Sequence, residues 1–250
     1  MALPDLRGKS AVITGASRGI GAGIAKDFHA RGLRLALCSR GAPALPDGTD
    51  VLARTLDVAD EAAVHAFARD AFARFGRLDL WINNAGVLDP IVPARALTAE
   101  ALRRHLDVNL FGVLFGCQAY LRHAADRQGG GVLINISSGA AWQGYAGWAA
   151  YCAGKAALDR LSETLQLEEG ARGVRVHAVA PGIVDTAMQA LIRSQEAEVF
   201  PEVERFRSLK REEAFNSVAF VAQRLLEVAF DPAARPREVL VRLPAEKQGP

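Results

Sequence analysis

The sequence predicts an α/β fold in which a mostly parallel, doubly wound sheet is covered by helices on both faces. Short apolar segments alternate with helical patterns, a glycine-rich turn follows the first apolar segment, and no Pro/Gly/Ser-rich linker divides the 250 residues. Strands that alternate with helices are joined by right-handed crossovers, which produce a parallel sheet buried on both faces. We therefore expect a single domain over residues 1–250.

The expected strands are short apolar runs bounded by turn residues. They are Ser10–Thr14, Leu33–Cys38, Val51–Leu56, Leu78–Ile82, Val132–Ile136, Val174–Val179 and Val239–Leu243. Apolar residues recur at helical spacing over Arg18–Ala30, Asp60–Phe75, Leu97–Arg127, the segment that bears Tyr151 and Lys155, and Val218–Phe230. We expect Gly41–Asp50 to be a surface loop. Residues 183–215 are expected to be irregular and to fold over the domain as a substrate-binding lid.

The composition argues against several classes of protein. No apolar run approaches the roughly 20 residues that span a bilayer, and Met1–Lys9 lacks the apolar run of a secretory signal. Three widely spaced cysteines and five histidines show no metal-ligand spacing. We therefore expect reduced thiols, no metal and a cytoplasmic location. With a net charge of +2 and no Lys/Arg-rich run, neither a nucleic-acid nor a membrane partner is expected.

The segment Thr14–Gly21 has the spacing TGxxxGxG directly after the first expected strand. Glycines at these positions permit a tight turn, close approach of the backbone to a pyrophosphate, and close packing of helix on strand. The following helix offers free N–H groups and the positive end of its dipole. A glycine-rich turn alone is weak support, but its place between a strand and a helix predicts a dinucleotide site. Its expected contacts are Gly15, Ser17, Arg18, Gly19, Ile20 and Gly21.

The residues after the second expected strand favour NADP(H) as the cofactor. A site for NAD usually has an acidic side chain there, which binds the ribose 2′-hydroxyl, whereas this chain has Ser39 and Arg40. Arg18 is expected to point to the same corner. Charge-assisted hydrogen bonds contribute about 1.5 to 3 kcal/mol each, so two arginines would favour NADPH over NADH by roughly a hundredfold. Alternatively, both are ordinary solvated arginines among the 25 of the chain.

Tyr151 and Lys155 are the candidate catalytic pair. Four residues apart on a helix, they lie on one face and can reach the same small volume. An ammonium at ~4 Å contributes about 4 kcal/mol, which is enough to lower the phenol pKa from near 10 toward neutrality. Ser138 follows a strand, at the sheet edge where α/β proteins bind ligands, and its hydroxyl can donate to a substrate oxygen. These groups predict hydride transfer to a ketone or aldehyde. Alone, a Tyr-x-x-x-Lys pair is more often a tyrosine beside a solvated lysine.

Six motifs occur in order along nearly the whole chain: TGASRGIG, NNAG at Asn83–Gly86, VNLFG around Asn109, ISSGA around Ser138, YCAGK, and PGIVDTAM at Pro181–Met188. In these motifs the chain resembles the short-chain dehydrogenase/reductase family. The resemblance implies a Rossmann-type domain with a seven-stranded sheet. It also implies a catalytic tetrad of Asn109, Ser138, Tyr151 and Lys155, in which Asn109 holds a water for proton relay behind Lys155.

The resemblance extends to the contacts of the cofactor. It implies that Asp57 and Val58 border the adenine, that Asn84, Ala85 and Gly86 line the adenosine side, and that Ser39 and Arg40 prefer NADP. It further implies that the segment Pro181–Met188 holds the nicotinamide carboxamide. The residues expected to make contacts there are Pro181, Gly182, Val184, Thr186 and Met188.

Within the family, the stretches after Gly147 and Val179 are most similar to sepiapterin reductase and bacterial benzil reductases, which are NADPH-dependent carbonyl reductases. Sepiapterin reductase anchors its pterin with an acidic residue near the C-terminus, but Glu246 is displaced from that place. We therefore expect an aromatic or hydrophobic diketone rather than a pterin. The expected substrate contacts, beside Ser138 and Tyr151, are Trp142, Gln143, Tyr145, Met188, Phe200 and Phe206. Trp148 is expected to pack in the core or against another subunit.

Two further expectations remain open. By resemblance, the helical segment Leu106–Leu121 and the helix after Tyr151 form a dimer surface, although the same apolar residues could be intramolecular core. The main functional hypothesis is an NADPH-dependent carbonyl reductase. One alternative is a nucleotide-binding sensor or scaffold without catalysis, which predicts erosion of the tetrad. The other is an NAD-dependent alcohol dehydrogenase, which the missing acidic residue after the second strand disfavours.

Overall fold

Seven parallel strands form one sheet in the order β3-β2-β1-β4-β5-β6-β7. We describe them from a computed structural model that covers residues 4–124 and 130–247. The strands are β1 (Ser10–Thr14), β2 (Arg34–Ser39), β3 (Val51–Thr55), β4 (Leu80–Asn83), β5 (Gly131–Ile136), β6 (Val174–Ala180) and β7 (Leu240–Arg242). The predicted α/β class and parallel sheet are confirmed.

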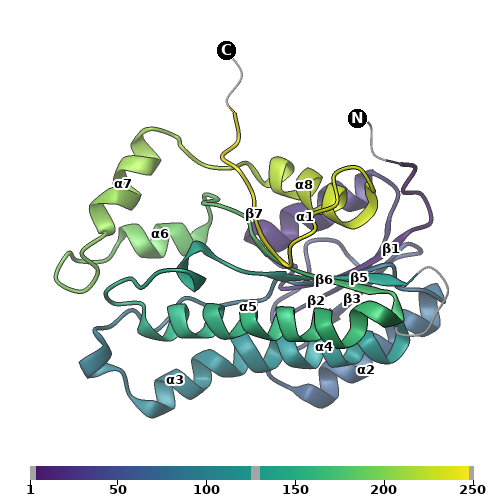
Figure 1. Cartoon of the computed structure of the whole chain (residues 1–250), viewed down its shortest axis with the longest axis horizontal. Coiled ribbons are helices and arrows are strands. Elements are labelled where there is room, and N and C mark those ends of the chain that lie inside the picture. Colours follow the sequence, from purple (N-terminus) through teal and green to yellow (C-terminus); the bar gives the residue numbers. More distant parts are fainter. Residues whose placement is uncertain (1–3, 125–129, 248–250) are drawn as a thin grey trace.

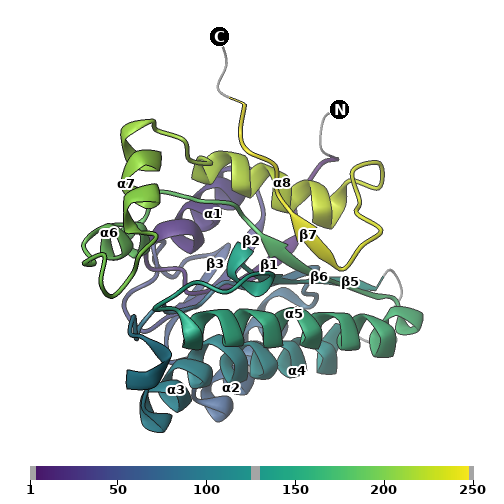
Figure 2. The ribbon, with the colours of Figure 1, turned by 60° about the vertical axis from the view of Figure 1, so that its left-hand side comes forward.

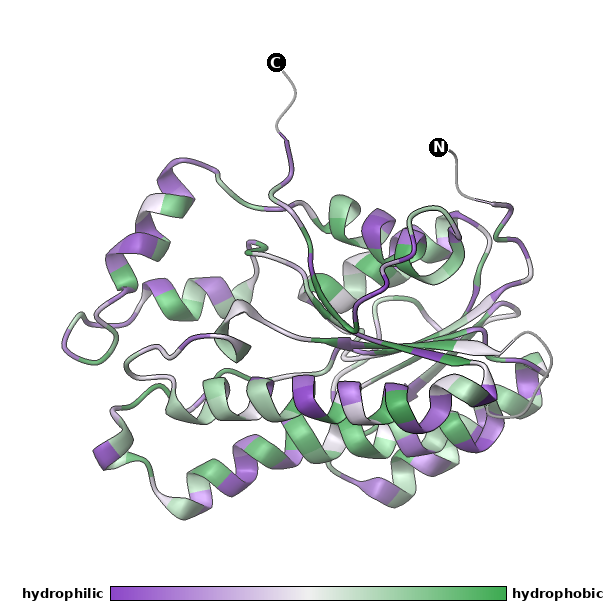
Figure 3. Ribbon diagram, in the orientation of Figure 1, coloured by the Kyte–Doolittle hydropathy of each residue, from purple (hydrophilic) through white to green (hydrophobic). Residues whose placement is uncertain are grey.

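Helices cover both faces of this sheet (Figures 1 and 2). On one face lie α1 (Gly19–Ala30) and α8 (Val218–Phe230), and on the other lie α2 (Glu61–Phe75), α4 (Gly112–Ala124) and α5 (Ala149–Glu169). A separate hydrophobic core fills each interface. Because both faces are covered, β1 and β5 are buried at every residue. Hydrophobic residues are correspondingly frequent in the strands of the sheet (Figure 3).

Local signals define several of the helix ends. The Asp60 carboxylate accepts the N–H of Ala63 and begins α2, and Gly76 ends it in the left-handed conformation. The Ser217 hydroxyl caps α8 in the same way, by accepting the N–H of Phe220. None of the helices within the described ranges is long and apolar enough to span a membrane.

The prediction of one continuous helix over Leu97–Arg127 is wrong, because a π-helical turn interrupts the α-helix. The segment forms α3 (Ala99–Leu106), a π-helical turn (Asp107–Phe111) and α4, and its expected end at Arg127 lies outside the described residues. A π turn widens the helix by one residue, which the spacing of apolar residues does not reveal. The turn contains Asn109, whose side chain is completely buried.

The segment 183–215, expected to be irregular, contains two helices. They are α6 (Ala187–Arg193) and α7 (Val203–Arg211), which project at the end of the molecule that holds the carboxyl ends of the strands (Figures 1 and 2). Both are too short for a helical period to stand out in the sequence. They are stabilised by tertiary packing, because Ile192, Val203 and Phe206 are buried in a third hydrophobic cluster with Trp148 and Tyr151.

Candidate active site

A cleft of about 930 Å³ runs along the carboxyl ends of the strands. It brings together motifs as distant in the chain as the glycine-rich turn and Pro181–Met188, because parallel strands end at the same edge of the sheet. Nearly all of the predicted cofactor contacts line it. They are Gly15, Ser17, Arg18, Gly19, Ile20, Ser39, Arg40, Asp57, Val58, Asn84, Ala85, Gly86, Tyr151, Lys155, Pro181, Gly182, Val184, Thr186 and Met188.

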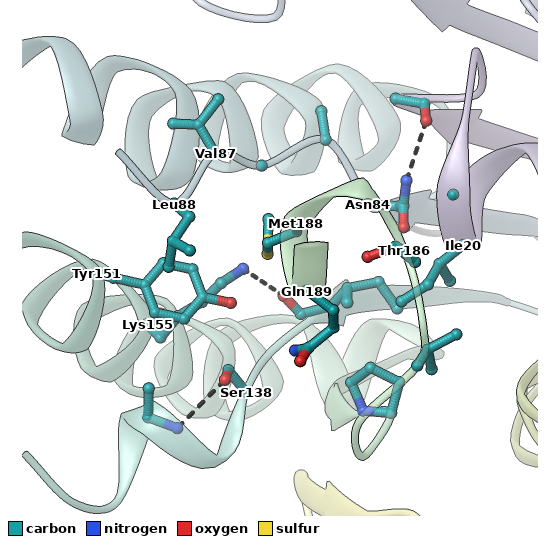
Figure 4. Close-up of a pocket in the computed structure, with 18 of the residues that line it drawn as sticks. Ile20, Asn84, Val87, Leu88, Ser138, Tyr151, Lys155, Thr186, Met188 and Gln189 are labelled. Carbon is teal, nitrogen blue, oxygen red and sulfur yellow. Dashed lines mark hydrogen bonds between the residues drawn. The ribbon is translucent and has the colours of Figure 1, made fainter. Parts of the chain in front are cut away.

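The glycine-rich turn packs closely against the residues that follow β4. Gly15 has a φ of +69°, and a Cβ there would lie 2.7 Å from the Ala85 Cα, so only glycine fits. The Thr14 hydroxyl accepts the backbone N–H groups of Asn84 and Ala85 at 3.0 and 3.1 Å, and the Asn84 side chain donates to the Thr14 carbonyl. The same Asn84 side chain also donates to the Gly15 carbonyl (Figure 4). Gly21 does not line the cleft, because it packs behind the turn against the Gly15 carbonyl.

This turn fits a dinucleotide pyrophosphate. Helix α1 begins at Gly19, and its N-cap residue Arg18 makes no side-chain cap, so the first N–H groups have no side-chain acceptor. Arg18 and Arg40 are both exposed at this end of the cleft. Among the described residues, no carboxylate forms an ion pair with either guanidinium. Both cations are therefore available to an anionic ligand.

Three members of the predicted tetrad lie together at the other end of the cleft (Figure 4). Tyr151 and Lys155 project from one face of α5, and Ser138 follows β5. The Lys155 ammonium donates to the Ile136 carbonyl at 2.7 Å and lies 5.8 Å from the centre of the Tyr151 ring. Tyr151 is only 8% exposed, so its side chain lies in a largely water-excluded volume.

The expected lowering of the Tyr151 pKa by Lys155 is not what the structure shows. Burial raises the pKa of the Tyr151 phenol, and the nearby Ser138 hydroxyl opposes this only in part. Burial also lowers the pKa of Lys155 to about 8, against the opposing effect of Asp159. The prediction considered only the attraction between the two groups, whereas both are desolvated and the ammonium is directed to the Ile136 carbonyl.

Asp159 supports the charge of Lys155 from one turn further along α5. Its carboxylate is buried and accepts the Ser137 hydroxyl through Oδ1, while Oδ2 is buried without a hydrogen-bond partner. Burial raises the pKa of Asp159, and both Ser137 and the charge of Lys155 lower it. Asp159 was not among the predicted site residues, although its place four residues after Lys155 could have indicated it.

Asn109, the fourth member of the predicted tetrad, does not line the cleft. Its side-chain Oδ1 accepts the Val87 N–H at 3.0 Å, and its Nδ2 donates to the Val87 carbonyl at 2.8 Å. It thus fixes the segment after β4, where Val87 and Leu88 form a wall of the cleft above Tyr151 (Figure 4). Its water-holding role in a proton relay stays a prediction.

The predicted substrate contacts divide into two groups. Trp142, Gln143, Tyr145, Met188 and Phe206 line the cleft. Phe200 does not: it is completely buried and stacks on Trp148 with ring centres 4.6 Å apart, so the prediction of a substrate contact is wrong. It supports the lining from behind.

Trp148 packs in the core as expected, and part of it also reaches the cleft. Three lining residues could not be found from the sequence. Arg242, at the end of β7, stacks its guanidinium 3.8 Å from the centre of the Trp142 ring. Gln189 and Arg205 enter the lining from α6 and α7. Nothing in the order of the chain indicates that residues so far from Ser138 face the same cavity.

Comparison with known proteins agrees with this geometry. A model of the short chain dehydrogenase family matches residues 9–197. The chain is 37% identical to 3beta-hydroxysteroid dehydrogenase 1 of Eggerthella lenta over 195 residues, and the alignment covers 74% of each chain. It is 33% identical to benzil reductase ((S)-benzoin forming) of Bacillus subtilis over 229 residues. This alignment covers 87% of this chain and 91% of the relative. A solved short chain dehydrogenase of Burkholderia cenocepacia in complex with NADP has a TM-score of 0.77 at 28% identity, covering 96% and 98% of the chains.

The Rossmann-like sheet and the cleft at its carboxyl edge define the class of nicotinamide-dependent oxidoreductases. The chain belongs to the short-chain dehydrogenase/reductase family, whose members act on alcohol or carbonyl groups of small molecules. The predicted family and fold are confirmed. Within the described ranges, no three His, Cys, Asp or Glu side chains are grouped to hold a metal ion, and the absence of a metal requirement stays a prediction.

The buried carboxylate makes the pH dependence of this site testable. Replacing Asp159 by asparagine removes the negative charge that raises the pKa of Lys155, so that pKa falls below its present value of about 8. The protonated lysine is then lost at a lower pH, and the alkaline limb of kcat for carbonyl reduction moves to lower pH. The Lys155 pKa can be measured directly by NMR of labelled lysine, because the chain has five lysines.

Glu168→Gln is the matched control, since Glu168 is an exposed carboxylate on the same helix and, unlike Glu163, does not act on Asp159. Its alkaline limb stays where that of the unmodified protein lies. An unchanged Lys155 pKa in Asp159→Asn would show that the carboxyl group is neutral near pH 8 and has no influence on the lysine.

Proposed function

We propose that this protein is an NADPH-dependent carbonyl reductase that transfers a hydride to a ketone or α-diketone, with Tyr151 as the general acid. The observation that carries the proposal is that one cleft joins an anion-binding turn with two unpaired arginines to the group of Ser138, Tyr151 and Lys155. An apolar region lies beyond that group, where a carbonyl compound can approach the hydroxyls. No other arrangement of the described residues combines these parts.

The charges at the turn support NADPH rather than NADH. In a charged 2′-phosphate the oxygens are strong acceptors, and guanidinium groups bind them as charge-assisted pairs. Arg18 and Arg40 stand exposed at the corner of the cleft next to the end of β2, where Ser39 is turned to its own loop by a hydrogen bond to the Gly41 carbonyl. The solved relative from Burkholderia cenocepacia was determined with NADP, which agrees with this assignment.

The chemistry assigns one role to each polar group. The cofactor, when bound, supplies the hydride that attacks the carbonyl carbon. The hydroxyl groups of Ser138 and Tyr151 donate hydrogen bonds to the carbonyl oxygen as negative charge develops on it, and Tyr151 transfers its proton to give the alcohol. Because burial raises the pKa of Tyr151, the phenol holds its proton at neutral pH and is in the correct state to act as an acid. Lys155 then stabilises the phenolate that remains.

The walls of the cleft support a substrate with hydrophobic or aromatic substituents. Leu88, Trp142, Trp148, Met188 and Phe206 surround the space next to Tyr151, and apolar walls bind such groups by removing them from water. The relatives named benzil reductase and hydroxysteroid dehydrogenase agree with a bulky apolar substrate. A pterin is not proposed, because Glu246 binds Ser217 at the start of α8 and lies outside the cleft.

The test of the proposed activity is the oxidation of NADPH with a panel of carbonyl compounds. Benzil and other aryl diketones are expected to give a higher kcat/KM than diacetyl, because only they fill the apolar walls. Tyr151→Phe is expected to lower kcat about 100-fold or more, since the general acid is removed while the ring packing is kept. Binding of NADPH without turnover of any compound would instead identify a nucleotide-binding protein without catalysis.

The cofactor preference has its own test in the ratio of kcat/KM for NADPH over NADH. Replacing Arg18 or Arg40 by alanine is expected to lower this ratio about tenfold or more, through loss of a charge-assisted hydrogen bond to the phosphate. Arg95→Ala is the control, because Arg95 is exposed but does not line the cleft. Equal kcat/KM for the two cofactors in the unmodified protein would reject the assignment and favour an alcohol dehydrogenase that uses NAD.

We also propose that the protein is a homodimer formed through α4 and α5. Phe111, the last residue of the π turn directly before α4, and Leu167, on α5, are 44% and 85% exposed, and they are the exposed large apolar residues of the described chain. Replacing both by glutamate is expected to convert a dimer into a monomer of 26.7 kDa, as measured by light scattering. A monomeric unmodified protein would contradict the proposal.

A further inference from the structure

A buried histidine lies directly behind the active site and has no part in the chemistry described above. His105 is in the last turn of α3 and is only 2% exposed. Its Nδ1 lies 2.6 Å from the Asp89 carbonyl oxygen, and its Nε2 lies 2.7 Å from Nδ2 of Asn109. The imidazole thus connects the segment after β4 with the π turn that holds Asn109.

The hydrogen bonds determine which nitrogen of His105 carries the proton. The Asn109 side chain accepts a hydrogen bond from the Val87 N–H and donates one to the Val87 carbonyl, which fixes the orientation of the Asn109 amide. The second hydrogen of Asn109 Nδ2 is therefore directed at His105 Nε2, which must accept it. The proton of the neutral imidazole then lies on Nδ1 and is donated to the Asp89 carbonyl.

The contacts form a chain that ends in the cleft. His105 is hydrogen-bonded to the Asn109 amide, and Asn109 is hydrogen-bonded to both the N–H and the carbonyl of Val87. Val87, Leu88 and Asp89 line the cleft, and Figure 4 shows the first two. The imidazole also meets the Tyr151 ring edge to face, with ring centres 6.1 Å apart. One side chain therefore contacts two members of the predicted tetrad and fixes the cleft wall above the phenol.

We propose that His105 is a positioning residue of the active site, which in its neutral form fixes the Asn109 amide and, through it, the Val87–Asp89 wall that faces the reacting carbonyl. The proposal rests on the proposed function for its kinetic consequence only, because the arrangement of hydrogen bonds is a property of the folded chain. A leucine of similar volume would fill the space, but it would leave the Asn109 donor without a partner.

Protonation of His105 breaks this arrangement. An imidazolium would direct an N–H group at the Asn109 NH₂ group, so that two donors would face each other. Burial and the positive charge of Lys155 on α5 lower the pKa of His105, while the Asp89 carbonyl and carboxylate raise it. Tyr151, whose ring contacts the imidazole, stays neutral in this range because burial raises its pKa. The net shift is downward, so the neutral form required for positioning is present at neutral pH.

The sign of the pH effect follows from this shift. An unfolded histidine takes up a proton near pH 6.5, and the folded protein resists it until a lower pH. The stability that neutral His105 contributes is therefore complete above about pH 6.5 and is lost as pH falls from there through the folded pKa. Loss of kcat is expected when the folded protein itself takes up the proton.

The experiment compares His105→Leu with His105→Gln, whose Oε1 can replace Nε2 as the acceptor and does not titrate. His105→Leu is expected to lower kcat about tenfold, with KM for NADPH little changed, because one buried donor loses its partner. His105→Gln is expected to recover most of this loss. Its kcat is also expected to lack the acid limb that His105 gives the unmodified protein.

A second readout does not depend on activity. Hydrogen exchange at the Val87 amide, whose acceptor is Asn109, is expected to be faster in His105→Leu than in the unmodified protein and in His105→Gln. This measurement still tests the positioning if no carbonyl compound is turned over, so its failure is distinct from failure of the proposed function.

His65→Leu is the control, because His65 is also buried with a lowered pKa but lies on α2. It is expected to leave kcat, the acid limb and Val87 exchange unchanged. Equal loss of kcat in His105→Leu and His105→Gln with the acid limb retained would overturn the proposal. Unaltered exchange at Val87 in His105→Leu would overturn it as well.

Discussion

The close approach of β1 and β4 is the constraint on which the active site depends. The strand order reverses at this point, with β2 and β3 on one side and β5, β6 and β7 on the other. The backbones of Gly15 and Ala85 pass so close that no Cβ fits between them. A crevice opens where crossovers leave the sheet in opposite directions. The phosphate turn and the Asn84–Asp89 segment lie at its two sides, so the same contact shapes both the cofactor end and the wall above Tyr151.

Burial of charged and polar groups gives the site its chemical character. Lys155 and Asp159 are buried on one face of α5, and each lowers the cost of ionising the other. At the end of β5, the Ile136 carbonyl accepts a hydrogen bond from Lys155, and the hydroxyl of the next residue, Ser137, donates one to Asp159. Such a pair requires fixed partners, because an unpaired buried charge is strongly destabilising. The strand end and the helix therefore determine each other's position.

Hydrogen-bonded segments and apolar packing form opposite walls of the cleft. On one side His105 and Asn109 hold the backbone of Val87–Asp89 by hydrogen bonds. On the other side, α6 and α7 are held by apolar contacts of Phe200 and Phe206 with Trp148, and Asp185 pairs with Arg193 of α6 and Lys210 of α7. Directed hydrogen bonds restrict the positions of their partners more closely than non-directional apolar contacts do. The hydrogen-bonded wall thus fixes the geometry near the phenol, and the wall at α6 and α7 combines apolar packing with ion pairs.

The sequence by itself determined the order of strands and helices, the turn at Gly15 and the grouping of Ser138, Tyr151 and Lys155. These features depend on local chemistry: apolar periodicity, the conformational freedom of glycine, and the spacing of residues along a helix. Tertiary structure alone decided the π turn at Asn109, the helices within 183–215, the burial of Phe200, the entry of Arg242 into the cleft and the place of His105 behind it. It also reversed the expected direction of the Tyr151 pKa. Burial and contacts between distant segments depend on which surfaces meet in space, and no short window of the sequence contains that information.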